Sequence, residues 1–205
     1  SSSSRGLGDV YKRQASEDLN VLHLIALVFL ERNLPKKAAA CFDRLSDLYK
    51  HNPIPLEILR PMALAYQRSD RISEAALAAE KTISCSNVSA DDWLNFGFIS
   101  LENGDAAKAR SAFNHVLNNE IENSDAYFGL GRANIDLERF EEADLALGKA
   151  LHFAPDDPEV RFFRAKALCE LGNDRQAINL LLEATQIDPT FTEAVSYTHL
   201  TLPTT

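Results

Sequence analysis

The chain has 205 residues, of which 45% are hydrophobic and 25% charged, a balance typical of a globular protein rather than a disordered one. Its formal net charge of −9 argues against a nucleic-acid backbone as the main partner, because phosphates are bound by clustered Lys and Arg. No run of about 18 apolar residues occurs, so no membrane span is predicted. Cys41, Cys85 and Cys169 lack metal-ligand spacing, which favours reduced side chains and a cytoplasmic location.

The chain begins with "SSSSRGLGDVYKRQ", which shares no pattern with the sequence that follows. We expect 1–14 to be a non-native or disordered tail, since it resembles translated adapter sequence found at the ends of environmental gene fragments. The first segment with helical character comes next and contains "VLHLIALVFL". This apolar run is too short to span a membrane and predicts one buried helix.

Two series of small residues then recur along the chain. One consists of Ala38, Ala75, Ala109, Ala143 and Ala177, and the other of Ala26, Ala63, Gly97, Gly131 and Ala165. Successive members are 34 residues apart, except at the first step of each series, which is 37. Apolar residues at i, i+3, i+4 and i+7 indicate pairs of helices of about 12 to 14 residues joined by short polar turns. Small residues are expected where two helix backbones approach closely.

The junctions between these pairs carry signals for helix starts. In "VSADD", Ser89 and Asp92 form a capping-box pattern. In "APDDPEV", Asp157 can cap a helix that begins at Pro158, where the missing N–H of proline has no cost. A new helix pair is therefore expected to start at each of these places.

The units resemble the tetratricopeptide repeat, in which large and small residues recur at fixed positions. The fourth unit carries the pattern most fully, with Tyr127, Leu130, Gly131, Phe140, Ala143, Leu147, Ala150 and Pro155. The resemblance covers residues 17–194 and implies an all-α solenoid of helix-turn-helix repeats forming a right-handed superhelix. The expected units are 19–55, 56–89, 90–123, 124–157 and 158–191.

Several units depart from the pattern of the family. The second keeps few of its residues, and the third has Ile121 where Pro is usual. The fifth has Arg161 and Arg164 where large apolar residues are expected. The first is longer than the others, and its three extra residues fall near "YKHNPIP". A longer second helix or a longer loop is therefore expected in the first unit.

In the tetratricopeptide family, the first helices of the pairs line a concave face that usually holds a peptide or a partner helix. The resemblance therefore implies a partner-binding groove lined by Arg60, Phe98, Phe128, Arg132, Phe162 and Lys166. Phenylalanines beside cations would suit a protein or peptide with apolar and acidic side chains. The alternative is an ordinary solenoid surface, in which the phenylalanines are partly buried between repeats.

The sequence contains no pattern typical of a catalytic site. There is no HExxH, no phosphate-binding loop and no GxSxG, and no catalytic, metal-binding or cofactor-binding residue is predicted. The leading hypothesis is a protein-interaction scaffold with no chemistry of its own. The alternative is the repeat region of a larger enzyme, such as a glycosyl- or sulfotransferase, whose catalytic domain would lie beyond residue 194.

The chain ends with "VSYTHLTLPTT", in which β-branched residues and Pro203 oppose helix formation. Thr190 and Glu193 repeat the capping-box pattern, so a sixth unit is expected to start at 192 and to be interrupted. We expect 195–205 to be a second non-native or disordered tail that resembles adapter sequence. Because terminal repeats normally need a polar capping helix, self-association through the uncapped C-terminal end is also expected.

Overall fold

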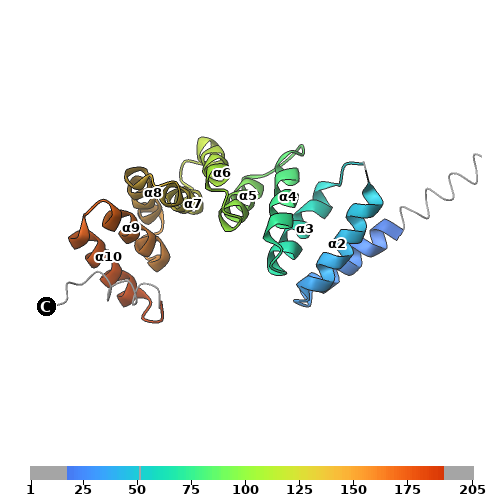
Figure 1. The fold of residues 1–205 in the computed structure, drawn as a ribbon, viewed down its shortest axis with the longest axis horizontal. Helices are drawn as coiled ribbons and strands as arrows, with labels where there is room; N and C mark the ends of the chain where they lie inside the picture. Colours follow the sequence, from blue (N-terminus) through green and yellow to red (C-terminus); the bar gives the residue numbers. More distant parts are fainter. Residues whose placement is uncertain (1–17, 51, 192–205) are drawn as a thin grey trace, which may run out of the picture. The chain divides into compact units, whose positions relative to one another are not determined.

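A computed structural model describes residues 18–50 and 52–191 of the chain. The tails expected at 1–14 and 195–205, and the sixth unit expected from 192, lie outside the described residues. The chain divides into two compact units, unit 1 up to Val88 and unit 2 from Ser89 onward. All regular elements in the described ranges are α-helices, as Figure 1 shows, which confirms the predicted all-α repeat fold.

Within the described residues 18–50 and 52–88, unit 1 contains two helix pairs. The helices are 18–31, α2 (Pro35–Tyr49), α3 (Leu56–Arg68) and α4 (Ile72–Ile83). The second helix of the first pair, α2, has 15 residues, whereas its counterpart α4 has 12. The segments that follow α2 and α4 have equal lengths. Relative to α4, the three extra residues of the first repeat lengthen the second helix. Relative to the 14-residue second helices of unit 2, α2 is one residue longer and the segment after it is two residues longer.

Unit 2 contains three helix pairs of nearly uniform length. They are α5 (Ala90–Glu102) with α6 (Ala106–Asn119), α7 (Ser124–Asp136) with α8 (Phe140–Phe153), and α9 (Pro158–Glu170) with α10 (Asp174–Ile187). The predicted caps are present. The Ser89 hydroxyl accepts from the backbone N–H of Asp92, and the Asp92 carboxylate accepts from the backbone N–H of Ser89. Asp157 accepts from the N–H groups at the start of α9.

In each helix pair, the turn between the two helices contains one residue with a left-handed backbone conformation. The φ angles are 54° at Asn33, 65° at Asp70, 80° at Gly104, 57° at Glu138 and 74° at Gly172. The N–H of the next residue donates to a carbonyl five residues back, as from Arg71 to Tyr66 at 2.9 Å. This hydrogen bond satisfies a carbonyl that the end of the first helix would otherwise leave without a partner.

The alanines of the 34-residue series lie at the centre of each pair. All five members of the series from Ala38 to Ala177 are fully buried. The glycines of the second series also lie where helices meet. A Cβ at Gly131 would lie 2.4 Å from Cγ of Leu147 on the partner helix, which is closer than van der Waals contact allows. The prediction that small residues mark close helix approach is therefore confirmed.

One of the core clusters of unit 2 contains the fully buried ring of Phe113 from α6. Two glycines border this ring from different helices. A Cβ would lie 2.6 Å from the ring at Gly97 of α5, and 2.2 Å from it at Gly129 of α7. Any larger residue at either position would displace the ring, so two glycines allow one large aromatic side chain to fill the space between α5 and α7.

Unit 1 joins its two pairs with a polar network at the turn between α3 and α4. Arg71 donates to both carboxylate oxygens of Asp43 on α2, at 2.8 and 3.1 Å, and to Glu74 at 3.0 Å. The Tyr66 hydroxyl donates to Asp43 at 2.9 Å, and the Arg71 guanidinium lies 4.6 Å from the centre of the Tyr66 ring. The Arg71 hydrogen bonds hold the pKa of Asp43 below its ordinary value, while burial and then the Asp43 hydrogen bond raise the pKa of Tyr66.

Candidate partner-binding site

Four of the six predicted groove residues lie on two first helices of unit 2. Phe128 and Arg132 are one turn apart on α7, and Phe162 and Lys166 are one turn apart on α9. Residues at this spacing share a helix face, so each helix presents one aromatic ring and one cation on the same side. All four side chains are partly exposed.

These side chains gather around a fifth residue, Phe163. Its ring lies 5.6 Å from the Phe128 ring and 5.4 Å from the Phe162 ring, in both cases edge to face. The Arg132 guanidinium lies 4.9 Å from the centre of the Phe163 ring, and the Lys166 ammonium lies 5.7 Å from it. Edge-to-face rings and cations over ring faces are both favourable arrangements. We call Phe128, Arg132, Phe162, Phe163 and Lys166 the aromatic–cation cluster.

Sequence reasoning missed Phe163 because the groove positions of the family do not include it. The signal was nevertheless present, since "RFFRAK" places two adjacent aromatic residues between cations. The cluster continues beyond α9, where the ring of Phe191 lies 5.5 Å from that of Phe162. Phe163 therefore connects the two helices that the family pattern treats separately.

The other two predicted groove residues lie elsewhere. Phe98, on α5, packs edge to face on Phe113 with ring centres 5.0 Å apart, and so belongs to the core cluster around Phe113. This environment matches the alternative reading, in which phenylalanines of the strip are partly buried between repeats. The three phenylalanines of the aromatic–cation cluster are likewise partly buried and pack against core clusters. Arg60 is exposed on α3 in unit 1. The geometry of unit 2 thus unites four of the predicted residues.

The cations of the cluster are not neutralised by nearby carboxylates. Among the described residues, neither Arg132 nor Lys166 forms an ion pair or a side-chain hydrogen bond. The two arginines of α9, in contrast, both form ion pairs. Arg161 pairs with Glu183 at 3.2 Å and Arg164 with Asp144 at 2.7 Å. The departures from the family pattern at Arg161 and Arg164 are therefore accommodated by ion pairs with neighbouring second helices.

The described residues offer neither a candidate metal site nor a candidate membrane span. Across 18–50 and 52–191, no group of three or more His, Cys, Asp or Glu side chains is placed to hold a metal ion. No helix in those ranges is long and apolar enough to cross a membrane. The groups with the largest pKa shifts in that part of the chain, Tyr66 and Arg71, belong to the polar network that joins α2 to α3 and α4.

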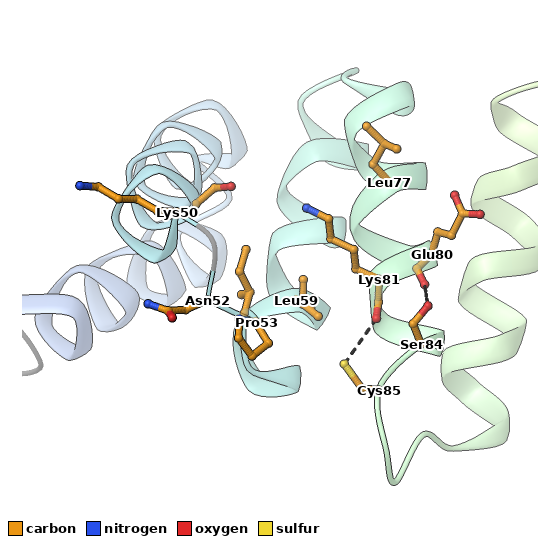
Figure 2. Close-up of a pocket in the computed structure, with 11 residues that line it drawn as sticks. Lys50, Asn52, Pro53, Leu59, Leu77, Glu80, Lys81, Ser84 and Cys85 are labelled. Atoms are coloured by element: carbon orange, nitrogen blue, oxygen red, sulfur yellow. Dashed lines mark hydrogen bonds between the residues drawn. The ribbon is translucent and has the colours of Figure 1, made fainter.

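Unit 1 contains a cavity of about 520 Å³ between α2 and α4 (Figure 2). Its walls come from the end of α2, the segment that leads into α3, and the second half of α4. Pro53, Ile54, Leu59 and Leu77 form its apolar lining. In Figure 2 the side chain of Lys81 projects into the space between the two helices.

Comparison with known proteins supports the repeat fold. Residues 100–161 match the sequence profile of the tetratricopeptide repeat. No curated protein matches the chain. Among solved structures, YrrB, a TPR protein with an unusual peptide-binding site, is 15% identical, with a TM-score of 0.70 over 87% of this chain and 90% of YrrB. MamA from Desulfovibrio magneticus RS-1 is 17% identical, with a TM-score of 0.72 over 84% of this chain and 96% of that one.

At such identities the structural likeness shows the fold alone, and the sequence match adds the repeat type. The match spans all of α6 to α8 and reaches into α5 and α9. The periodic alanines and the recurring left-handed turns extend the same plan through both units. The chain therefore has the all-α repeat fold of tetratricopeptide-repeat proteins, and residues 100–161 match that repeat in sequence.

Proposed function

We propose that unit 2 binds a peptide segment of a partner protein, and that the segment carries apolar and acidic side chains. The observation that carries the proposal is the pair of uncompensated cations over aromatic rings on α7 and α9. A carboxylate could bind Arg132 or Lys166 without displacing a partner from the described part of the chain. The array would act as a scaffold, and no catalytic role is proposed.

The acidic preference follows from Arg132. Its guanidinium lies 5.6 Å from the centre of the Phe128 ring and 4.9 Å from that of Phe163. Stacking on two rings restricts the guanidinium before any partner arrives, so less side-chain entropy is lost on binding. The planar group can then bind a carboxylate through two parallel hydrogen bonds.

The apolar preference follows from the rings themselves. Phe128, Phe162 and Phe163 are only partly buried, and each can cover further apolar surface when a partner side chain packs on it. Aromatic residues and arginine are also the residue types that most often dominate the energetics of protein interfaces. A short peptide with alternating apolar and acidic residues would satisfy both requirements.

A peptide-library selection on the full chain tests the proposal. We expect wild type to enrich acidic-apolar peptides, and the double variant Arg132→Glu/Lys166→Glu to lose the acidic enrichment. The control variant Arg175→Glu/Lys36→Glu makes the same change in charge at two exposed positions outside the cluster and should select like wild type. Unchanged acidic selection by the cluster variant would disprove the proposed site.

The expected self-association through the C-terminal end is a separate part of the proposal. On α10, the last helix described, Leu182 is 48% exposed and Ile187 is 41% exposed. Light scattering over a concentration series should show oligomers that Leu182→Lys/Ile187→Lys converts to monomers. A concentration-independent monomer for wild type would contradict self-association and would leave the peptide proposal intact.

A further inference from the structure

Unit 1 contains a second candidate binding site that is independent of the aromatic–cation cluster. We propose that the cavity between α2 and α4 takes one apolar side chain of a peptide together with the carboxylate of the residue next to it. The site lies between two second helices, with α3 and the segment that leads into it completing the lining, whereas the cluster in unit 2 is formed by first helices.

The cavity arises from the irregular length of the first repeat. Three helical residues add about 4.5 Å to a helix, so the longer α2 ends further along its axis than a helix of the length of α4 would. The chain must then return to α3 through Pro53 and Ile54. This return path forms the wall opposite α4 and leaves a space between the two second helices.

The lining of the cavity suits an apolar side chain. Leu59 is buried at 2% exposure, while Leu77, on the facing side of α4, is 60% exposed. A branched aliphatic side chain placed between these residues would cover the exposed surface of Leu77. Burial of apolar surface of this kind is the main favourable contribution to such association.

Three charged residues line the cavity, Lys50, Glu80 and Lys81. In Figure 2 the side chains of Lys50 and Glu80 point away from the space between α2 and α4, which leaves Lys81 as the cation that faces it. The Ser84 hydroxyl already donates to the carbonyl of Glu80 at 2.9 Å, and the Cys85 thiol donates to the carbonyl of Lys81 at 3.4 Å. The Lys81 ammonium points into the cavity in Figure 2, and within 18–50 and 52–191 it has no ion-pair or hydrogen-bond partner. A carboxylate next to the apolar side chain would therefore complement Lys81.

The occupant is a peptide side chain rather than an enclosed small molecule because the cavity is open to solvent. Several of its lining residues are exposed, among them Asn52, Pro53 and Leu77. Enclosed ligand sites usually bury most of the ligand surface. An open hollow of this size can accept one side chain while the rest of the partner stays outside.

Cys85 provides a reporter, because its partly exposed thiol lines the cavity. In a full chain carrying Cys41→Ser/Cys169→Ser, Cys85 is the remaining cysteine. The rate of its alkylation by iodoacetamide is measured with the blocked hexapeptide Gly-Ser-Leu-Glu-Gly-Ser. At about 90% occupancy we expect the rate to fall about tenfold. No protection at the highest soluble peptide concentration would overturn the proposal.

Two control peptides separate the apolar and the acidic parts. The peptides Gly-Ser-Leu-Gln-Gly-Ser and Gly-Ser-Ser-Glu-Gly-Ser should protect Cys85 much less. Lys81→Glu should remove the protection by the first peptide, and so should Leu77→Ser, which changes an exposed residue and should leave folding intact. Equal protection by all three peptides would overturn the assignment.

Two further controls locate the effect. In a chain carrying Cys41→Ser/Cys85→Ser, the thiol of Cys169 in unit 2 should react at the same rate with and without peptide. Protection of Cys85 should also persist when Arg132→Glu/Lys166→Glu is added. Loss of protection in that background would assign the peptide to the cluster in unit 2 and overturn the site in unit 1.

Discussion

Unit 1 and unit 2 are built from the same repeat but differ at the contacts between consecutive helix pairs. Unit 2 places the Phe113 ring against Gly97 and Gly129, where any larger residue would meet the ring. Unit 1 also buries apolar residues, such as Phe42 and Leu45 on α2. It adds, between α2 and the next pair, a partly exposed network of Asp43, Tyr66 and Arg71. Close apolar packing contributes more stability than a solvent-exposed ion pair, so the two junctions should respond very differently to substitution.

The largest expected effect comes from removing the buried ring of Phe113 in unit 2. Phe113→Ala should lower the free energy of unfolding by about 3–5 kcal/mol, because it leaves a cavity between α5 and α7. Urea unfolding measures the loss, and hydrogen exchange should place it in α5 to α7. Phe153→Ala, at a ring that is 39% exposed, is the control and should cost clearly less. Equal losses would contradict the assignment of Phe113 to the core.

A smaller effect is expected from filling one of the glycine positions. Gly129→Ala should lower the free energy of unfolding by about 1–3 kcal/mol, because its Cβ would overlap the Phe113 ring. In a Phe113→Ala background the same change should have little effect, since neighbouring residues are coupled. Gly148→Ala is the matched control. Its Cβ would approach Arg164 no closer than 3.6 Å, so it should stabilise α8 slightly.

The polar network of unit 1 should contribute less and should depend on pH. Asp43→Asn is expected to cost at most about 1 kcal/mol, because the Asp43 and Arg71 side chains are 45% and 34% exposed. The pKa of Asp43 is lowered in the folded protein, so its stabilisation is present above the unfolded pKa and is lost as pH falls through the folded pKa.

Urea unfolding at neutral and acid pH measures this dependence. Wild type and Asp43→Asn should differ at neutral pH and converge in acid. Glu74→Gln serves as a comparison. It removes the ion pair between Arg71 and Glu74 and leaves the ion pair between Arg71 and Asp43 of α2 in place. A difference that grows in acid would contradict the assigned role of Asp43.

The smallest effect is expected at the turn between α7 and α8. Glu138 has φ 57°, a conformation that a non-glycine residue adopts at some cost. Glu138→Gly should therefore raise the free energy of unfolding by about 0.5–1 kcal/mol, even though glycine loses more backbone entropy on folding. Asp70→Gly should gain less, because aspartate tolerates this conformation better. Thermal unfolding of both variants would rank them.

The repeat architecture could be predicted from the sequence because the packing constraint is periodic. An alanine that must lie against a neighbouring helix recurs with the repeat, and all five members of that series are buried as expected. The capping box at Ser89 was equally visible, since its residues are three apart in sequence. A feature whose residues all lie within one repeat can therefore be predicted from a single sequence.

The candidate sites were less accessible to sequence reasoning because they depend on contacts between repeats. Phe163 lies outside the family's groove positions, and its role emerges only when α7 lies beside α9. Asp43 and Arg71 are 28 residues apart, which is not a repeat length. The cavity in unit 1 depends on how the extra residues of the first repeat divide between α2 and the segment after it, which the sequence alone does not fix.

The left-handed turn residues also bear on how such an array can change over evolutionary time. Because every turn is closed by its own hydrogen bond, an insertion in one helix is absorbed before the next turn and does not shift the spacing of later repeats. The steps after the first repeat accordingly return to 34 residues. A repeat protein of this construction can acquire a local irregularity, and the surface feature that comes with it, while every other repeat keeps its inherited packing.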